Sequence, residues 1–335
     1  MSTVRVSVGI SVRVLGFAAI VSGCWLLGYG SEVLALDPQT STHVLNATHV
    51  PNSPTLQNTP PVPSPVLDEI RSTGILRVAI ANHAIPLSFR YPDGRLDGYC
   101  LDLIDEIAEA VTVQLGLNRR PLIEIVTSQL GTRFDLIRSG EVQLECGPNT
   151  IQPIAGVTFS EPFLITGIQF ISKQDLDPPF NPQATQAPLA LGALRNSTTA
   201  ALLADRYPNA IIETFVGTMG IRRGIDALQG QLNAFATDSL LLLGELAVAG
   251  RSLEDYQLSP DEPLACSPYG VLLPTPDQAW IDMVNRVIVG DRGAALWDKW
   301  FARVDYYLQI TADRCALDVT PVEAVSESGQ HTLDL

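Results

Sequence analysis

The sequence predicts an α/β protein of two lobes that share one plan and are joined by a two-strand hinge. From about residue 66, strand-like apolar runs alternate with stretches of helical periodicity, which is typical of parallel α/β layers. Residues 130–147 and 219–238 both run helix, Gly turn, strand and polar residue. The elements after residue 269 lack partner strands, so we expect them to return to the first lobe. The chain would then pass between the lobes twice, and the two connecting strands would form a hinge. The expected lobes are 66–168 with 270–315, and 169–269.

The elements are predicted in order from the spacing of apolar residues. Leu103, Ile104, Ile107 and Val111 recur at helical spacing, whereas the short apolar run 76–80 is typical of a buried strand. We expect first-half strands at 76–80, 122–127 and 142–146 and helices at 102–115 and 132–139. Second-half strands are expected at 189–194, 211–215 and 232–237, and helices at 198–204, 219–228 and 240–249. A strand at 269–273 and helices at 278–289 and 294–301 close the fold, with crossings at 167–172 and 265–271.

Composition excludes some functions. The chain has 335 residues, of which 46% are hydrophobic, so it can bury a large core. A net charge of −15 without any basic cluster argues against nucleic-acid binding. The four histidines are scattered, and we expect neither a metal nor a cofactor.

The N-terminus predicts export. Arg5 and Arg13 precede an apolar run, and Val33-Leu34-Ala35 supplies a cleavage pattern, so residues 1–35 are expected to be a signal peptide. Two alternatives stay open: a lipoprotein leader to residue 23 with Cys24 as the lipidated residue, and an uncleaved anchor helix. All three place the rest outside the cytoplasm. Residues 36–65, rich in Pro, Thr and Asn, are expected to be a disordered linker, and 316–335 a disordered tail.

Two segments carry a family resemblance. GILRVAIANHAIPLSFRYPDGRLDGYCLDLIDEIAEAV at 74–111, followed by GVTFSEPF at 156–163, resembles the extracellular solute-binding proteins of family 3. These periplasmic proteins capture polar amino acids for ABC transporters. The resemblance covers about residues 66–304 and implies a periplasmic-binding-protein-like fold of type II. It also implies a monomer that closes around a small polar ligand, most often an amino acid, and hands it to a membrane permease. A cyclohexadienyl-dehydratase-like enzyme and a ligand-sensing module remain alternatives.

Ligands of open α/β sheets bind beyond the carboxyl ends of the strands, near helix N-termini. The rule selects residues 83–89, 149–150 and the loop around Arg133 in the first lobe, and residues 195–199 and Asp238 in the second lobe. Within these segments the expected ligand-binding residues are Phe89, Arg133, Asn149, Thr150, Ser197, Thr198 and Asp238. Simpler interpretations remain open. The three second-lobe residues are good helix caps. Phe89 also fits a core position.

The resemblance implies roles for these residues and one departure. Asp238 would pair with the ligand's ammonium, and the turn at Ser197 and Thr198 would bind its carboxylate. Pro153 stands where the family has an arginine that clamps this carboxylate.

Either another arginine compensates for Pro153, or the ligand has no carboxylate. Arg133 lies in a segment that resembles the glutamate/aspartate-binding branch, and it is the leading substitute. A solvated arginine at a helix start is the other interpretation of Arg133. Arg195 and Arg90 are weaker candidates.

An oxidising compartment favours disulfides. The resemblance extends to ionotropic glutamate receptor domains, and there it implies a Cys266–Cys315 bridge. Cys100 and Cys146 would then pair or remain buried thiols.

Overall fold

A computed structural model describes residues 63–91, 93–217 and 219–302, together with 304, 308, 311 and 313–315. The expected signal peptide, the expected tail and most of the expected linker lie outside the described residues. The end of the linker is corrected. Helix α1 (Pro65–Thr73) begins inside it, because Ser64 caps the helix by accepting a hydrogen bond from Leu67 N and donates one to Asp277 at 2.9 Å.

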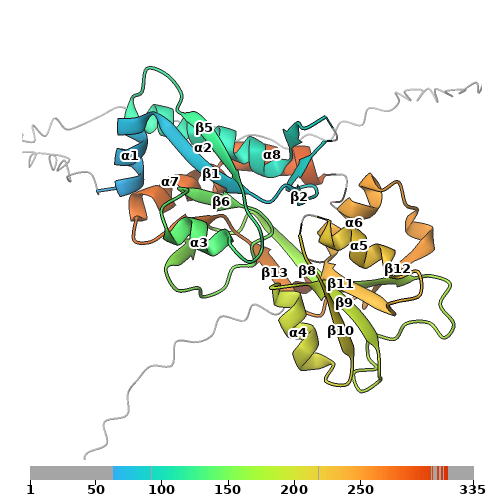
Figure 1. The fold of residues 1–335 in the computed structure, drawn as a ribbon. Coiled ribbons are helices and arrows are strands. Elements are labelled where there is room, and N and C mark those ends of the chain that lie inside the picture. Colours follow the sequence, from blue (N-terminus) through green and yellow to red (C-terminus); the bar gives the residue numbers. More distant parts are fainter. Residues whose placement is uncertain are drawn as a thin grey trace, which may run out of the picture. The chain divides into compact units, whose positions relative to one another are not determined.

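The first lobe is built on a five-stranded sheet in the order β5-β1-β6-β14-β7 (Figure 1). Strand β1 runs parallel to β5 and β6, and β14 runs antiparallel to β6 and β7. The strands are β1 (Ile75–Ile80), β5 (Leu122–Thr127), β6 (Leu144–Cys146), β7 (Val157–Phe159) and β14 (Leu272–Pro274). A small antiparallel sheet contains β2 (His83–Ala84), β3 (Ser88–Arg90) and β4 (Leu96–Asp97). Its strands are not among those expected, although the sequence Pro92-Asp93-Gly94 indicates a hairpin turn between β3 and β4.

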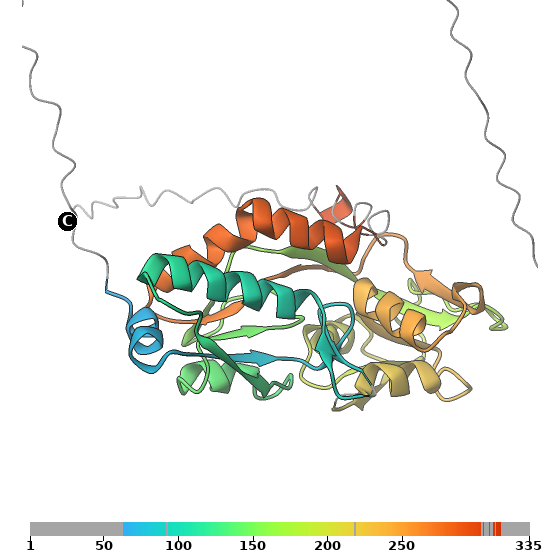
Figure 2. The same cartoon turned by 90° about the horizontal axis from the view of Figure 1, so that it is seen from above.

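Helices α2 (Tyr99–Leu115), α7 (Gln278–Val289) and α8 (Asp291–Phe301) pack beside one another in this lobe (Figure 2). Short helix α3 (Arg133–Arg138) follows β5. The buried Trp280 of α7 donates its indole N–H to the carbonyl of Gln143 at 2.9 Å. The C-terminal helices therefore belong to the first lobe, as the absence of partner strands predicts.

The second lobe is built on a sheet in the order β10-β9-β11-β8-β12, with β9, β10 and β11 parallel. Its strands are β8 (Leu164–Lys173), β9 (Ala190–Leu194), β10 (Ile211–Phe215), β11 (Ala234–Asp238) and β12 (Tyr256–Ser259). Its helices are α4 (Thr198–Arg206), α5 (Gly220–Asp226) and α6 (Ser239–Val248), with a 3-10 turn at Leu253–Asp255.

Strands β8 and β13 (Cys266–Tyr269) connect the two lobes. Strand β13 pairs antiparallel with the first half of β8, from Leu164 to Gly167, while the second half of β8 belongs to the second-lobe sheet. After β13 the chain enters β14 of the first-lobe sheet. The expected single strand at 269–273 is therefore two strands that break at Gly270 and Val271, between the hinge and the first lobe.

The described residues contain two disulfides. Cys266 of β13 is bonded to Cys315, with Cα atoms 5.6 Å apart, as the resemblance implies. Cys100 is bonded to Cys146, which decides between the two alternatives for that pair. The second bridge joins the start of α2 to the end of β6.

The Cys266–Cys315 bridge spans 49 residues of sequence. We expect a Cys266→Ser/Cys315→Ser double variant to lose about 4 kcal/mol of unfolding free energy in the chain-entropy description of disulfides. Chemical denaturation of both proteins measures this loss. An unchanged midpoint and slope would show that the bridge does not constrain the unfolded chain.

Candidate functional site

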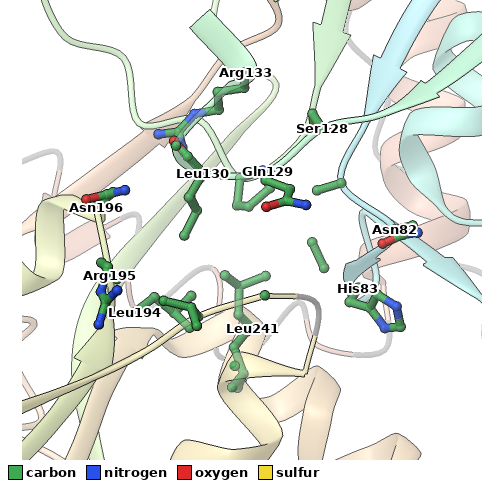
Figure 3. Close-up of a pocket in the computed structure, with 18 of the residues that line it drawn as sticks. Asn82, His83, Ser128, Gln129, Leu130, Arg133, Leu194, Arg195, Asn196 and Leu241 are labelled. Atoms are coloured by element: carbon green, nitrogen blue, oxygen red, sulfur yellow. The ribbon is translucent and has the colours of Figure 1, made fainter.

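A pocket of about 200 Å³ lies between the lobes, and both contribute its walls (Figure 3). First-lobe residues follow the carboxyl ends of β1, β5 and β6. Second-lobe residues follow β9 and β10 and include the start of α5 and Leu241 of α6. The pocket thus lies where the rule for open α/β sheets predicts a ligand.

The lobes approach each other closely on both sides of this pocket. A Cβ atom at Gly131 would lie 3.1 Å from the side-chain nitrogen of Asn196 in the second lobe. At Gly244 of α6, a Cβ atom would collide with the carbonyl oxygen of Ile85 in the first lobe. Glycine is therefore required at position 244 for this approach of α6 to the first lobe.

Arg133 is the buried cation of the pocket wall. It begins α3, and only 6% of the residue is exposed. Its Nη1 donates to the carbonyl of Leu130 at 2.6 Å, and the guanidinium lies 4.5 Å from the centre of the Phe134 ring. Its Nε is buried and has no hydrogen-bond partner among the described residues. Burial lowers the pKa of Arg133, and Glu145 opposes this shift. Arg133 is thus a charged residue of the pocket wall with one unpaired N–H.

Glu145 is a buried acid that sequence analysis missed. It lies within β6, is 1% exposed and lines the pocket. It accepts hydrogen bonds from Ser128 Oγ at 2.6 Å and from Asn149 Nδ2 at 2.5 Å. Burial raises the pKa of the Glu145 carboxyl, while Ser128, Arg133 and Asn149 oppose the shift. The one available signal was an acid inside an otherwise apolar strand.

Of the residues expected at the site, Arg133 and Asn149 line the pocket, and the others do not. Phe89 packs edge-on against Tyr91 and Trp300, with ring centres 5.2 and 6.4 Å apart. The backbone of Thr150 forms a bridge with Tyr269. Contacts of Phe89 and Thr150 with a ligand stay predictions.

Ser197, in the turn before α4, caps this helix. Ser197 Oγ accepts a hydrogen bond from Ala200 N at 3.1 Å and donates to the carbonyl of Leu194 at 2.7 Å. Thr198 is the first residue of α4. Asn196 has a left-handed φ of 63°, which asparagine tolerates, and it lines the pocket. The ligand roles of Ser197 and Thr198 stay predictions.

Asp238 ends β11 and is 7% exposed. It occupies the N-cap position of α6, but its side chain forms no capping hydrogen bond. Burial raises the pKa of Asp238, and the hydroxyls of Tyr269 and Ser267 oppose the shift. A buried carboxyl that does not cap its helix keeps the ammonium-binding role as a prediction.

Of the two other candidate arginines, Arg195 lines the pocket and Arg90 does not. Arg195 lines the pocket from the second lobe, and its Nε donates to Thr214 Oγ1 at 3.3 Å. Arg90 does not line the pocket, and it donates to the carbonyl of Gly94 at 2.6 Å. Pro153 is likewise absent from the pocket wall. His83 and Asn82, after β1, complete the polar lining.

Two α/β lobes that both line one pocket are the arrangement of a binding protein that holds its ligand between domains. The chain belongs to the bacterial extracellular solute-binding proteins, family 3, whose model matches residues 76–301. Within the described residues, no helix is long and apolar enough to cross a membrane.

Relatives and solved structures are similar over most of the chain. The L-glutamate/L-aspartate-binding protein of Pseudomonas aeruginosa is 27% identical over 71% of this chain and 80% of the relative. The glutamate/aspartate import solute-binding protein of Escherichia coli is 24% identical over 72% and 80%. A mutant of ArgBP from T. maritima has a TM-score of 0.61 at 20% identity, covering 71% of this chain and 99% of that structure. An ancestral amino acid-binding protein, a precursor of cyclohexadienyl dehydratase, has a TM-score of 0.59 at 20% identity, covering 70% and 99%.

Proposed function

We propose that this protein captures an amino acid outside the cytoplasm, holds its carboxylate at Arg133, and delivers it to the membrane permease of an ABC importer. Family membership supports the class of function, and the relatives' names support an amino acid as ligand. The observation that carries the ligand's chemistry is the free Nε of buried Arg133 at the pocket wall. The protein releases its ligand unchanged and acts as a monomer.

Arg133 replaces the arginine that Pro153 removes. A desolvated carboxylate needs a charge-assisted partner, and a guanidinium offers the strongest such pairing. Because Nη1 of Arg133 is held by Leu130, the side chain is already oriented. Less side-chain entropy is therefore lost when the ligand binds.

A second cation favours acidic amino acids. Arg195 lines the same pocket from the opposite lobe. Two arginines on facing walls suit a ligand with two carboxylates, and the two relatives named above are called glutamate/aspartate proteins. L-Glutamate and L-aspartate are the first ligands to test.

A thermal-shift screen over the amino acids, small organic acids and polyamines tests the proposal. A ligand present at one hundred times its dissociation constant stabilises the folded protein by about 2.7 kcal/mol. We expect an amino acid to give the largest shift and to be recovered chemically intact after incubation. A shift with polyamines alone, or conversion of the bound compound, would contradict the proposal.

Arg133→Ala should weaken binding of the carboxylate ligand more than tenfold, because the pocket loses its buried charge-assisted donor. Arg133→Lys should restore binding only in part, since an ammonium lacks the planar fork. Calorimetric titration measures both variants. Arg90→Ala, which lies outside the pocket, is the matched control, and exposed Arg195→Ala should cost less than Arg133→Ala. Wild-type affinity in Arg133→Ala would show that the ligand's carboxylate binds elsewhere.

Asp238→Asn should weaken binding of an ammonium-bearing ligand by roughly 2 to 5 kcal/mol, the scale for removing one member of a buried charge pair. The matched comparison is the corresponding ligand without its amino group, whose affinity should change little. Equal losses for both ligands in calorimetry would reduce Asp238 to a structural residue of the hinge region.

A further inference from the structure

Glu145 joins two pocket loops. Its carboxylate accepts hydrogen bonds from Ser128, after β5, and from Asn149, after β6. All three residues line the pocket and are at most 4% exposed. The acid is therefore held at the ligand site and shielded from bulk water.

One positive charge acts on this acid. The strand neighbours of Glu145 are Ala79 of β1 and Leu272 of β14, which carry no charge. Among the described residues, Arg133 of α3 is the charged group that stabilises the Glu145 anion. His83 and Arg195 also line the pocket, but neither they nor Asp238 contribute to the pKa shift of Glu145.

We propose that Glu145 takes up a proton when a ligand carboxylate binds at Arg133, so that capture of the ligand is coupled to proton uptake. This inference rests on the proposed function, because it needs a carboxylate at Arg133. The proton comes from solvent and ends on a carboxyl oxygen of Glu145.

The coupling follows from charge balance. In the empty pocket Arg133 offsets the cost of keeping Glu145 ionised in a buried position. A bound carboxylate pairs with Arg133 and also repels Glu145, so the ionised acid loses its support. Burial already raises the pKa of Glu145, and the ligand raises this pKa further.

A hydrogen-bond acceptor is available for the protonated carboxyl of Glu145. Asn149 Oδ1 is buried and has no hydrogen-bond partner among the described residues. Turning the Asn149 amide would put this oxygen where Nδ2 now meets Glu145, and there it would accept the new O–H. Ser128 can keep donating to the second carboxyl oxygen.

The sign of the pH dependence is fixed. A group whose pKa is higher in the complex than in the free protein binds a proton on association. Affinity therefore increases as pH falls between these two values, by at most tenfold per pH unit for one proton. Asp238 would act in the opposite direction, because a ligand ammonium favours its ionised form and so lowers its pKa.

Calorimetry with L-glutamate, in buffers of different ionisation enthalpy between pH 5 and 8, measures the protons taken up. We expect wild type to take up a substantial fraction of one proton, and Glu145→Gln to lose this uptake, so that only proton release from Asp238 remains. Glu69→Gln is the matched control, because Glu69 is hydrogen-bonded to Arg77 and Gln143 outside the pocket. Its proton uptake should equal that of wild type.

Two further variants keep the test decisive. His83→Gln should retain proton uptake, which separates Glu145 from the histidine of the same pocket. Ser128→Ala removes a donor that favours ionised Glu145, so proton uptake by this variant should move to higher pH. This measurement does not depend on whether Glu145→Gln folds. Tight L-glutamate binding without proton uptake, or uptake that persists in Glu145→Gln, would overturn this inference and leave the proposed function standing. Absence of binding by every amino acid in the screen would overturn both.

Discussion

The site depends on the antiparallel pairing of β8 with β13. These two strands carry the chain out of the first lobe and back again, and their register sets how the two sheets face each other. Only with the sheets so placed do the carboxyl ends of β1, β5 and β6 face those of β9 and β10. The pocket is thus a consequence of topology before any side chain contributes to it.

In the pocket, the two buried charges of Arg133 and Glu145 offset part of each other's desolvation cost. Arg133 alone would be costly at 6% exposure, and so would Glu145 at 1%. Each opposes the effect of burial on the other's pKa, and Ser128, Asn149 and Leu130 supply hydrogen bonds. Within this cluster of described residues, Nε of Arg133 and Oδ1 of Asn149 remain unpaired.

Apolar periodicity predicted the parallel strands and their helices, because burial of one face dictates both. It missed the small sheet β2-β3-β4, whose strands have two or three residues and carry no period. The strand-end rule found Arg133 and Asn149 because it depends on chain order. It missed Glu145, which lies inside a strand, and it could not separate Ser197 as a cap from Ser197 as a ligand contact. Side-chain direction, which decides both cases, is absent from the sequence.

Pro153 and Arg133 together suggest that the guanidinium for a ligand carboxylate can be placed on different segments of the same fold. A carboxylate needs a guanidinium within reach but does not specify the loop that carries it. In the function proposed above, Arg133 at the start of α3 supplies it, hydrogen-bonded to the carbonyl of Leu130. Strand β5, which precedes α3, is separated by β1 from the strand that carries Glu145. An arginine at this position offsets the charge of Glu145, which would otherwise be an uncompensated buried charge. Under the proposed function, the position of the cation therefore affects the ionisation of Glu145 as well as the binding of the ligand.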